Sequence, residues 1–110
     1  MEYFGGEIMM LIMNTVPDKE TAEKLAKSLV EKKLAACVSI IPIEKSVYRW
    51  KGKIEEKEEL LLLIKTKERL FQRVEAHIRA NHPHDMPEII GFRVDKGQQM
   101  YLSWIDRSTI

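Results

Sequence analysis

The feature that most constrains the fold is an apolar run, Leu60-Leu61-Leu62-Leu63-Ile64, inside a long extended segment. The segments Ala35 to Tyr48 and Ile54 to Thr66 both have the composition of strands, and Lys51-Gly52-Lys53 between them is typical of a turn. Together they predict a long β-hairpin. Because successive side chains of a strand point to opposite faces of a sheet, five apolar neighbours put hydrophobic side chains on both faces. A single covering layer therefore leaves one apolar face exposed.

The predicted hairpin is also too long for its own domain. At ~3.3 Å per residue, an arm of about 13 residues extends roughly 43 Å. A domain of 110 residues has a diameter of roughly 35 Å. A bend or break at Pro42 and in the polar stretch Glu55 to Glu59 is the alternative. A projecting hairpin with an uncovered apolar face predicts that copies of the chain associate.

The first half of the chain predicts a strand and a helix. The apolar run Ile8 to Asn14 has the length of a buried strand. Asp18 is placed to cap the helix that follows. The apolar positions of that helix recur with helical spacing: Ala22, Leu25, Ala26, Leu29 and Val30.

The second half predicts another helix, a last strand and a tail. Leu70, Val74 and Ile78 recur every four residues, with Thr66 as the expected cap of their helix. Pro87 to Val94 is expected to be a strand. A short amphipathic tail then contains Met100, Tyr101, Trp104 and Ile105.

This order predicts the α+β class and a ferredoxin-like βαββαβ fold, with an antiparallel sheet and two helices on one face. The long hairpin joins the second and third strands, and a short C-terminal element follows. Residues 8–110 are expected to form one domain and residues 1–7 a flexible leader ending near Gly5-Gly6.

Composition excludes several classes of function. Eighteen basic and seventeen acidic side chains leave a formal charge of +1, which disfavours binding to nucleic acid or to a membrane surface. A single cysteine excludes an intrachain disulfide and a CxxC-type zinc site. The apolar segment near the start is too short for a signal peptide or a membrane span. These features favour a cytoplasmic protein.

Five motifs in order resemble the CutA family, the divalent-cation tolerance proteins. They are KLAACVSIIP (33–42), SVYRWKGKIE (46–55), EELLLLIKT (58–66), HPHDMPEII (82–90) and YLSWI (101–105). The resemblance implies a ferredoxin-like subunit, a homotrimer built through the hairpins, and binding of Cu(II) or another divalent cation. Ser39, Ile43 and His84 depart from the usual pattern, where Asn, Gly and an aromatic residue are common.

Cys37, His82 and His84 are the candidate metal ligands, because thiolate and imidazole donors favour copper or zinc. A cysteine among small apolar residues can equally be a buried core residue. The histidine segment, with Asp85 and Glu88 nearby, can equally be a loop restrained by its prolines.

The other imidazole and thioether groups have simpler explanations. His77 lies beside the apolar stripe of its helix and is expected to be structural. Met9, Met10 and Met13 are expected to be core residues of the first strand.

Tyr48, Trp50, Glu59 and Lys65 match family positions that line a cleft between subunits. A cross-strand ion pair and an aromatic packing pair explain them without a ligand. Lys65 follows the apolar run and needs an anionic partner. That partner can be Glu59, another carboxylate across an interface, or a bound anion.

The sequence contains no catalytic motif, no phosphate-binding loop and no RNA-binding aromatic motif. We therefore expect a protein that binds a divalent cation without catalysis and without an organic cofactor. The alternative is a trimeric regulatory module similar to the PII-type signalling proteins. Its inter-subunit cleft would hold a small anionic ligand or a regulatory partner protein.

Overall fold

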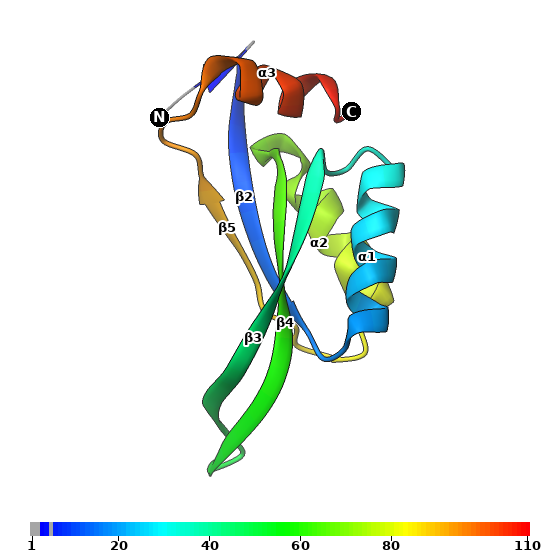
Figure 1. The fold of residues 1–110 in the computed structure, drawn as a ribbon, viewed down its shortest axis with the longest axis vertical. Helices are drawn as coiled ribbons and strands as arrows, with labels where there is room; N and C mark the ends of the chain where they lie inside the picture. Colours follow the sequence, from blue (N-terminus) through cyan, green and yellow to red (C-terminus); the bar gives the residue numbers. More distant parts are fainter. Residues whose placement is uncertain (1–2, 5) are drawn as a thin grey trace.

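The chain alternates strands and helices around one sheet, from which a long hairpin projects (Figure 1). The computed structural model describes residues 3–4 and 6–110. The elements in chain order are β1 (Tyr3–Phe4), β2 (Glu7–Val16), α1 (Lys19–Glu31), β3 (Cys37–Trp50), β4 (Lys53–Lys67), the 3-10 turn η1 (Glu68–Leu70), α2 (Phe71–Asn81), β5 (Ile89–Arg93) and α3 (Gln99–Arg107).

The sheet has the topology expected of a ferredoxin-like fold. β2 is central and pairs antiparallel with β4 on one side and β5 on the other, while β3 pairs with β4 at the edge. Helices α1 and α2 lie together on one side of this sheet (Figure 1). The α+β prediction is therefore confirmed, with β2 two residues longer at its end than expected and β5 shorter.

Part of the expected leader forms an additional strand. Tyr3 pairs with Ile8 and Phe4 with Glu7, so β1 and the start of β2 form a small antiparallel ladder. Residues 1–2 and 5 lie outside the described part of the chain. Flexibility of residues 1–7 stays a prediction.

The main core fills the space between the sheet and the two long helices. Strands contribute every second side chain to it, as the period of two requires. The residues of this core are Met10, Ile12, Val16, Ala22, Leu25, Leu29, Leu34, Ala35, Leu62, Ile64, Val74 and Ile78.

Helix α1 begins where the sequence predicts. The Asp18 carboxylate accepts a hydrogen bond from the Thr21 backbone N–H at 2.7 Å, which confirms Asp18 as the N-cap. Val30, the last residue of the apolar series, lies in this helix but is 42% exposed. At about 100° per residue, Val30 lies about 80° around the helix from Ala22, at the edge of the buried stripe.

Helix α2 begins later than predicted, and Thr66 does not cap it. Thr66 belongs to β4 and is fully buried, and its hydroxyl donates to the Leu34 carbonyl at 2.6 Å. A 3-10 turn separates β4 from α2, whose first turn has no side-chain cap. Leu70, Val74 and Ile78 are buried as predicted.

The hairpin is continuous and turns within two residues. The φ of Lys51 is 50° and that of Gly52 is 79°, the left-handed values that a two-residue hairpin turn of type I′ requires. The chain is 46 Å along its longest axis and only 26 and 22 Å across, and the hairpin extends past the helices (Figure 1). The projecting hairpin is therefore confirmed.

Pro42 lies on the edge strand β3, opposite Leu60, where its missing N–H removes no bond from a central ladder. The pairing register shifts by one residue between Ile43 and Ser46. A proline within a strand is expected at an edge position or at a bulge, and Pro42 is at an edge position.

The C-terminal tail forms α3, which packs on the side of the sheet opposite the two long helices. Leu102 and Ile105 form a second small core with Met9 and Ala36. Met9 alternates with the main-core residue Met10 along β2, so it points to the opposite face. Helix α3 lies across one end of the sheet (Figure 1) and covers only part of that face.

Candidate functional site

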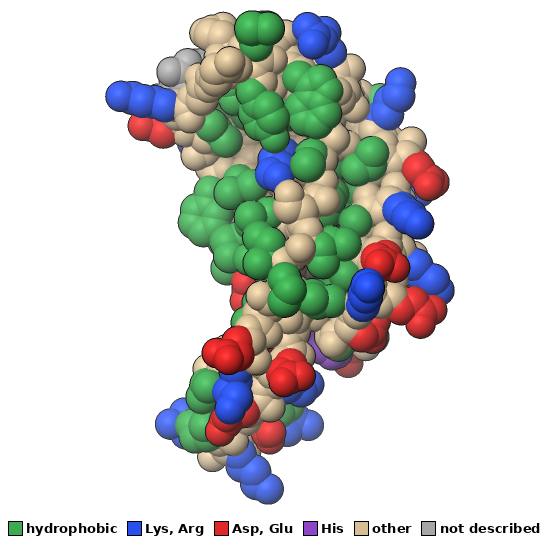
Figure 2. All heavy atoms as spheres, viewed as in Figure 1, with side chains coloured by type: hydrophobic (Ala, Val, Ile, Leu, Met, Phe, Trp, Pro, Cys, Tyr) green, Lys and Arg blue, Asp and Glu red, His purple; other side chains and the backbone are tan. Residues whose placement is uncertain are grey.

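Beyond α3, no element formed by residues 3–4 and 6–110 covers the second side of the sheet. We call this surface the open face. Along each strand, side chains point alternately to the helix-covered side and to the open face. Residues that are paired across neighbouring strands point to the same face. The residues of the open face are Leu11, Met13, Cys37, Ser39, Ile41, Leu61, Leu63, Lys65, Ile90 and Phe92. Figure 2 shows hydrophobic side chains gathered over the body of the sheet, whereas charged side chains cluster on the projecting hairpin.

The β3 bulge places the predicted cleft residues on one side of the hairpin. Before the bulge, Cys37 opposes Lys65; after it, Tyr48 opposes Glu55 and Trp50 opposes Lys53. Odd-numbered residues of β4 share one face throughout, so Tyr48 and Trp50 lie on the same side as Lys65. Without the extra residue, both aromatic rings would lie on the opposite side.

The predicted cleft residues are far apart within one chain. Glu59 precedes Lys65 by six residues along β4, about 20 Å at 3.3 Å per residue. Trp50, opposite Lys53, is about 40 Å from Lys65 along the same strand. A cleft that contains all of them requires more than one copy of the chain.

Lys65 is a cation in an apolar surface. Its ammonium donates to the Ser39 hydroxyl at 2.7 Å and contacts the Cys37 sulfur at 3.6 Å. Among the described residues, no carboxylate lies within ion-pair distance of it. From the sequence alone, Ser39 is only a departure from the family pattern. Its spacing of two from Cys37 is the feature that identifies it as a neighbour of Lys65.

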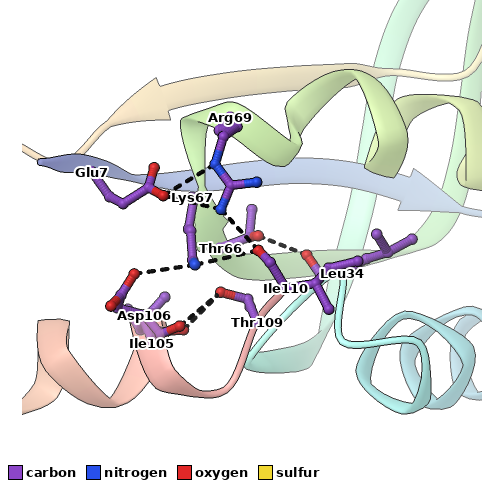
Figure 3. A network of polar contacts seen from close by, with 9 residues as sticks. All are labelled: Glu7, Leu34, Thr66, Lys67, Arg69, Ile105, Asp106, Thr109 and Ile110. Atoms are coloured by element: carbon purple, nitrogen blue, oxygen red, sulfur yellow. Dashed lines mark hydrogen bonds and ion pairs between the residues drawn. The ribbon is translucent and has the colours of Figure 1, made fainter. Parts of the chain in front are cut away.

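Lys67, two residues further along the same strand, has a carboxylate partner. It is covered by α3, and its ammonium lies 3.1 Å from the Asp106 carboxylate and donates to the Ile110 carbonyl at 3.3 Å (Figure 3). Arg69 donates to the same carbonyl and pairs with Glu7. Sequence reasoning missed this network, because α3 is distant in sequence from β4.

His82 is tied to the backbone through both ring nitrogens. Its Nε2 lies 2.8 Å from the Thr15 carbonyl, which requires a proton on Nε2, and its Nδ1 accepts the His84 backbone N–H at 3.1 Å. A metal ion bound at His82 would have to displace one of these bonds. The exposed His84 ring lies 5.1 Å from the His82 ring, centroid to centroid.

The structure does not bring Cys37 to the two histidines. Cys37 and Lys65 align with Leu11 of β2, whereas His82 contacts Thr15, about 13 Å further along that strand. In the described part of the chain, no three His, Cys, Asp or Glu side chains are grouped to hold a metal ion. A site with the three or four ligands that copper or zinc requires would need donors from several copies.

The remaining candidates have structural roles. His77 Nε2 lies 2.7 Å from the Ser28 hydroxyl and so joins α2 to α1. Burial, and secondarily the positive charge of Lys32, lowers the pKa of His77 from its ordinary value of 6.5. Met9 and Met10 are core residues as expected, whereas Met13 is half-buried on the open face.

These features define a class: a ferredoxin-like α+β subunit with a projecting hairpin and an apolar sheet face around one lysine. The comparisons with known proteins give the family. The model of the CutA1 divalent ion tolerance protein matches residues 10–108. The chain therefore belongs to the CutA1 family. The family is described by tolerance of divalent ions and not by a reaction.

Individual relatives agree with this assignment. The divalent-cation tolerance protein CutA of Thermus thermophilus is 42% identical over 99 residues, covering 90% of this chain and 96% of the relative. The chloroplastic CutA protein of Arabidopsis thaliana is 44% identical over 91% of this chain, and this chain spans only 55% of that relative. The crystal structure of CutA1 from Oryza sativa has a TM-score of 0.91 at 43% identity, covering 94% of each chain.

Relatives also differ in location. They include chloroplastic CutA proteins, and a solved structure of a periplasmic CutA from Archaeoglobus fulgidus is 41% identical, with a TM-score of 0.89 over 91% of this chain and 97% of that one. Across residues 3–4 and 6–110, no helix has both the length and the apolar character needed to span a bilayer.

Proposed function

We propose that the protein is a homotrimer that binds Cu(II) or another divalent cation reversibly in the cytoplasm, without catalysis. The observation that carries the proposal is membership of the divalent ion tolerance family over residues 10–108. Cys37 and His84 are the proposed donors, because thiol and imidazole groups favour copper and zinc.

The open face supports association of copies. Ile90 and Phe92 of β5 are about half exposed, and Ile41 of β3, at the opposite edge of the same face, is 38% exposed. Burying such side chains stabilises an assembly by roughly 25 cal/mol per Å² of apolar surface. A closed ring of copies, three in the family that the motifs resemble, would cover this face in every subunit.

Association also supports the cation-binding part of the proposal. In a closed trimer every donor occurs three times, so a ligand set can be completed by symmetry. The Lys65 ammonium, 3.6 Å from the Cys37 sulfur, opposes a cation at that thiol in one isolated chain. Binding at Cys37 therefore requires that Lys65 is paired or displaced in the assembly.

Calorimetric titration with Cu(II) and with Zn(II) tests the cation site. Wild type, Cys37→Ser and His84→Ala are compared, with His77→Gln as a control imidazole that is bonded between helices. We expect weaker binding in the first two variants and unchanged binding in the control. Unchanged affinity in both Cys37→Ser and His84→Ala would remove these residues as ligands.

A regulatory trimer similar to the PII-type proteins is the second candidate. The observation in its favour is Lys65, a cation without a carboxylate partner among the described residues. Thermal unfolding in the presence of metal ions, nucleotides or organic anions separates the two candidates, because a ligand selective for the native state raises Tm. A rise with organic anions alone favours the regulatory module.

A further inference from the structure

Two lysines on β4, Lys65 and Lys67, have different hydrogen-bond and ion-pair partners. Lys67 and Lys65 point to the same side of β4, because they are two residues apart. Where α3 covers Lys67, it supplies the Asp106 carboxylate at 3.1 Å. Lys65 lies beyond α3, and within the described part of the chain its ammonium has only a hydroxyl and a sulfur as neighbouring acceptors.

Covering the open face would bury the Lys65 ammonium. A buried charge without a charged partner is strongly unfavourable, so the surface that covers Lys65 must supply an anion. The hydroxyl of Ser39 does not neutralise the charge. The requirement follows from the chemistry of the face and is independent of any metal ion.

The hairpin contains carboxylates on the correct side. Glu59 and Glu55 share the odd-numbered side of β4 with Lys65, and neither has an ion-pair partner among the described residues. Glu59 directly precedes the apolar run and is half-buried within its own chain. At about 20 Å from Lys65 along the strand, it cannot pair with the Lys65 of its own chain.

We propose that Glu59 of one copy pairs with Lys65 of a second copy when the hairpin of the first lies over the open face of the second. The site around Ser39 and Cys37 is therefore complete only in the assembly. The inference rests on the proposed association of copies. It assigns the partner of Lys65 to a protein carboxylate, not to a small anion.

Repeating the same Glu59–Lys65 contact from each copy to the next produces a closed ring of copies. Each chain offers one Glu59 on its hairpin and one Lys65 on its open face, so the contact is heterologous and is made once per neighbouring pair. The pair also selects the relative orientation of the copies, because apolar contacts alone are non-directional.

Sedimentation velocity over a dilution series tests the pair with a charge exchange. Lys65→Glu and Glu59→Lys each place like charges together, and we expect each to raise the dissociation concentration at least about tenfold. The double variant Lys65→Glu/Glu59→Lys restores the opposite charges and is expected to return to within about threefold of wild type. Glu55→Gln, on the same side of the same strand, is the matched control and should leave association unchanged.

A second measurement uses the wild-type chain and does not depend on folding of variants. Equal amounts of isotopically heavy and light protein are mixed, allowed to exchange subunits, and treated with a carbodiimide that joins contacting amines and carboxylates without a spacer. We expect a heavy–light peptide pair that joins Lys65 to Glu59. Absence of that link, with links at other lysines present, would overturn the assignment.

The outcomes separate this inference from the function on which it rests. A wild-type chain that sediments as a monomer contradicts the proposed trimer. A wild-type trimer that is unaffected by Lys65→Glu contradicts only the Glu59–Lys65 pair. If Lys65→Glu instead leaves association intact and abolishes stabilisation by organic anions, Lys65 binds a small anion and the inference is wrong.

Discussion

At the scale of single residues, three polar side chains in or near the core each have a specific partner. Thr66 donates to Leu34, His77 is bonded to Ser28, and Lys67 pairs with Asp106. Each contact joins elements that are distant in sequence. Loss of one partner leaves the other buried and unpaired, which is more costly than the contact itself is favourable.

The Lys67–Asp106 pair gives a first prediction. Asp106→Ala should reduce the free energy of unfolding by about 3 kcal/mol, because the Lys67 side chain is only 6% exposed and keeps a single carbonyl acceptor. Guanidinium unfolding at neutral pH measures this loss. Glu20→Ala, which breaks the exposed pair with Lys24, should cost at most about 0.5 kcal/mol. Equal losses in the two variants would contradict the prediction.

His77 gives a prediction about pH. Because burial lowers the pKa of His77 in the folded chain, the unfolded chain binds the proton more readily. The resulting stability is present above pH 6.5 and is lost as pH falls from about 6.5 through the lowered folded pKa. His77→Gln should therefore show a smaller loss of stability between pH 7.5 and pH 5 than wild type. Parallel pH profiles for the two proteins would refute it.

At the scale of elements, the hairpin depends on two local irregularities. The two-residue turn requires left-handed backbone at both central positions, and the bulge between Ile43 and Ser46 changes which side of β3 faces outward. The strands themselves are regular on either side. The position of Tyr48 and Trp50 therefore depends on one extra residue, not on the composition of the strand.

The turn can be tested directly. Gly52 has φ near +79°, so Gly52→Ala should lower the free energy of unfolding by about 1 kcal/mol. Lys51 has φ near +50°, a region that Asn tolerates better than Lys, so Lys51→Asn should not destabilise the protein. Chemical unfolding of both variants at one protein concentration provides the comparison. A loss in Lys51→Asn as large as that in Gly52→Ala would be inconsistent with this turn.

At the scale of the whole molecule, the open face and the projecting hairpin are the features that support the proposed association of copies. Its longest dimension is 46 Å, about twice its other two. The apolar side chains on the uncovered sheet resemble half of a core. In the proposed trimer, a second copy would complete the environment of the residues around Lys65.

Phe92→Glu tests the open face. Phe92 is 50% exposed in the single chain, so the substitution should leave the subunit folded while placing a charge in the proposed interface. We expect a shift in sedimentation from three chains towards one, with an unchanged circular dichroism spectrum. Met86→Glu, at a 73% exposed position in the loop between α2 and β5, is the control and should remain assembled. Assembly of Phe92→Glu at wild-type concentrations would exclude this face from the interface.

Much of the fold was predictable because it depends on local periods. The spacing of Leu25 and Leu29 predicts α1, and the turn residues around Gly52, between two strand-like segments, predict the hairpin. Pro42 favours an edge position or a bulge, and it lies on an edge strand. The prediction that Thr66 caps a helix is wrong. From sequence, a threonine that caps a helix cannot be distinguished from a threonine in a strand whose hydroxyl donates to a distant carbonyl. The sequence predicts which residues are candidates for the site, but it does not predict their distances from one another in the folded chain.

The sequence by itself determined the kinds of elements, their order, and the excess of apolar surface over what one chain can cover. Only the tertiary structure decided that Lys67 has a carboxylate partner whereas Lys65 has none among the described residues. It also decided that both ring nitrogens of His82 are hydrogen-bonded. The physical reason is that periodicity is a property of neighbouring residues. Pairing of charges and hydrogen bonds depends on segments that are brought together by packing of the whole chain.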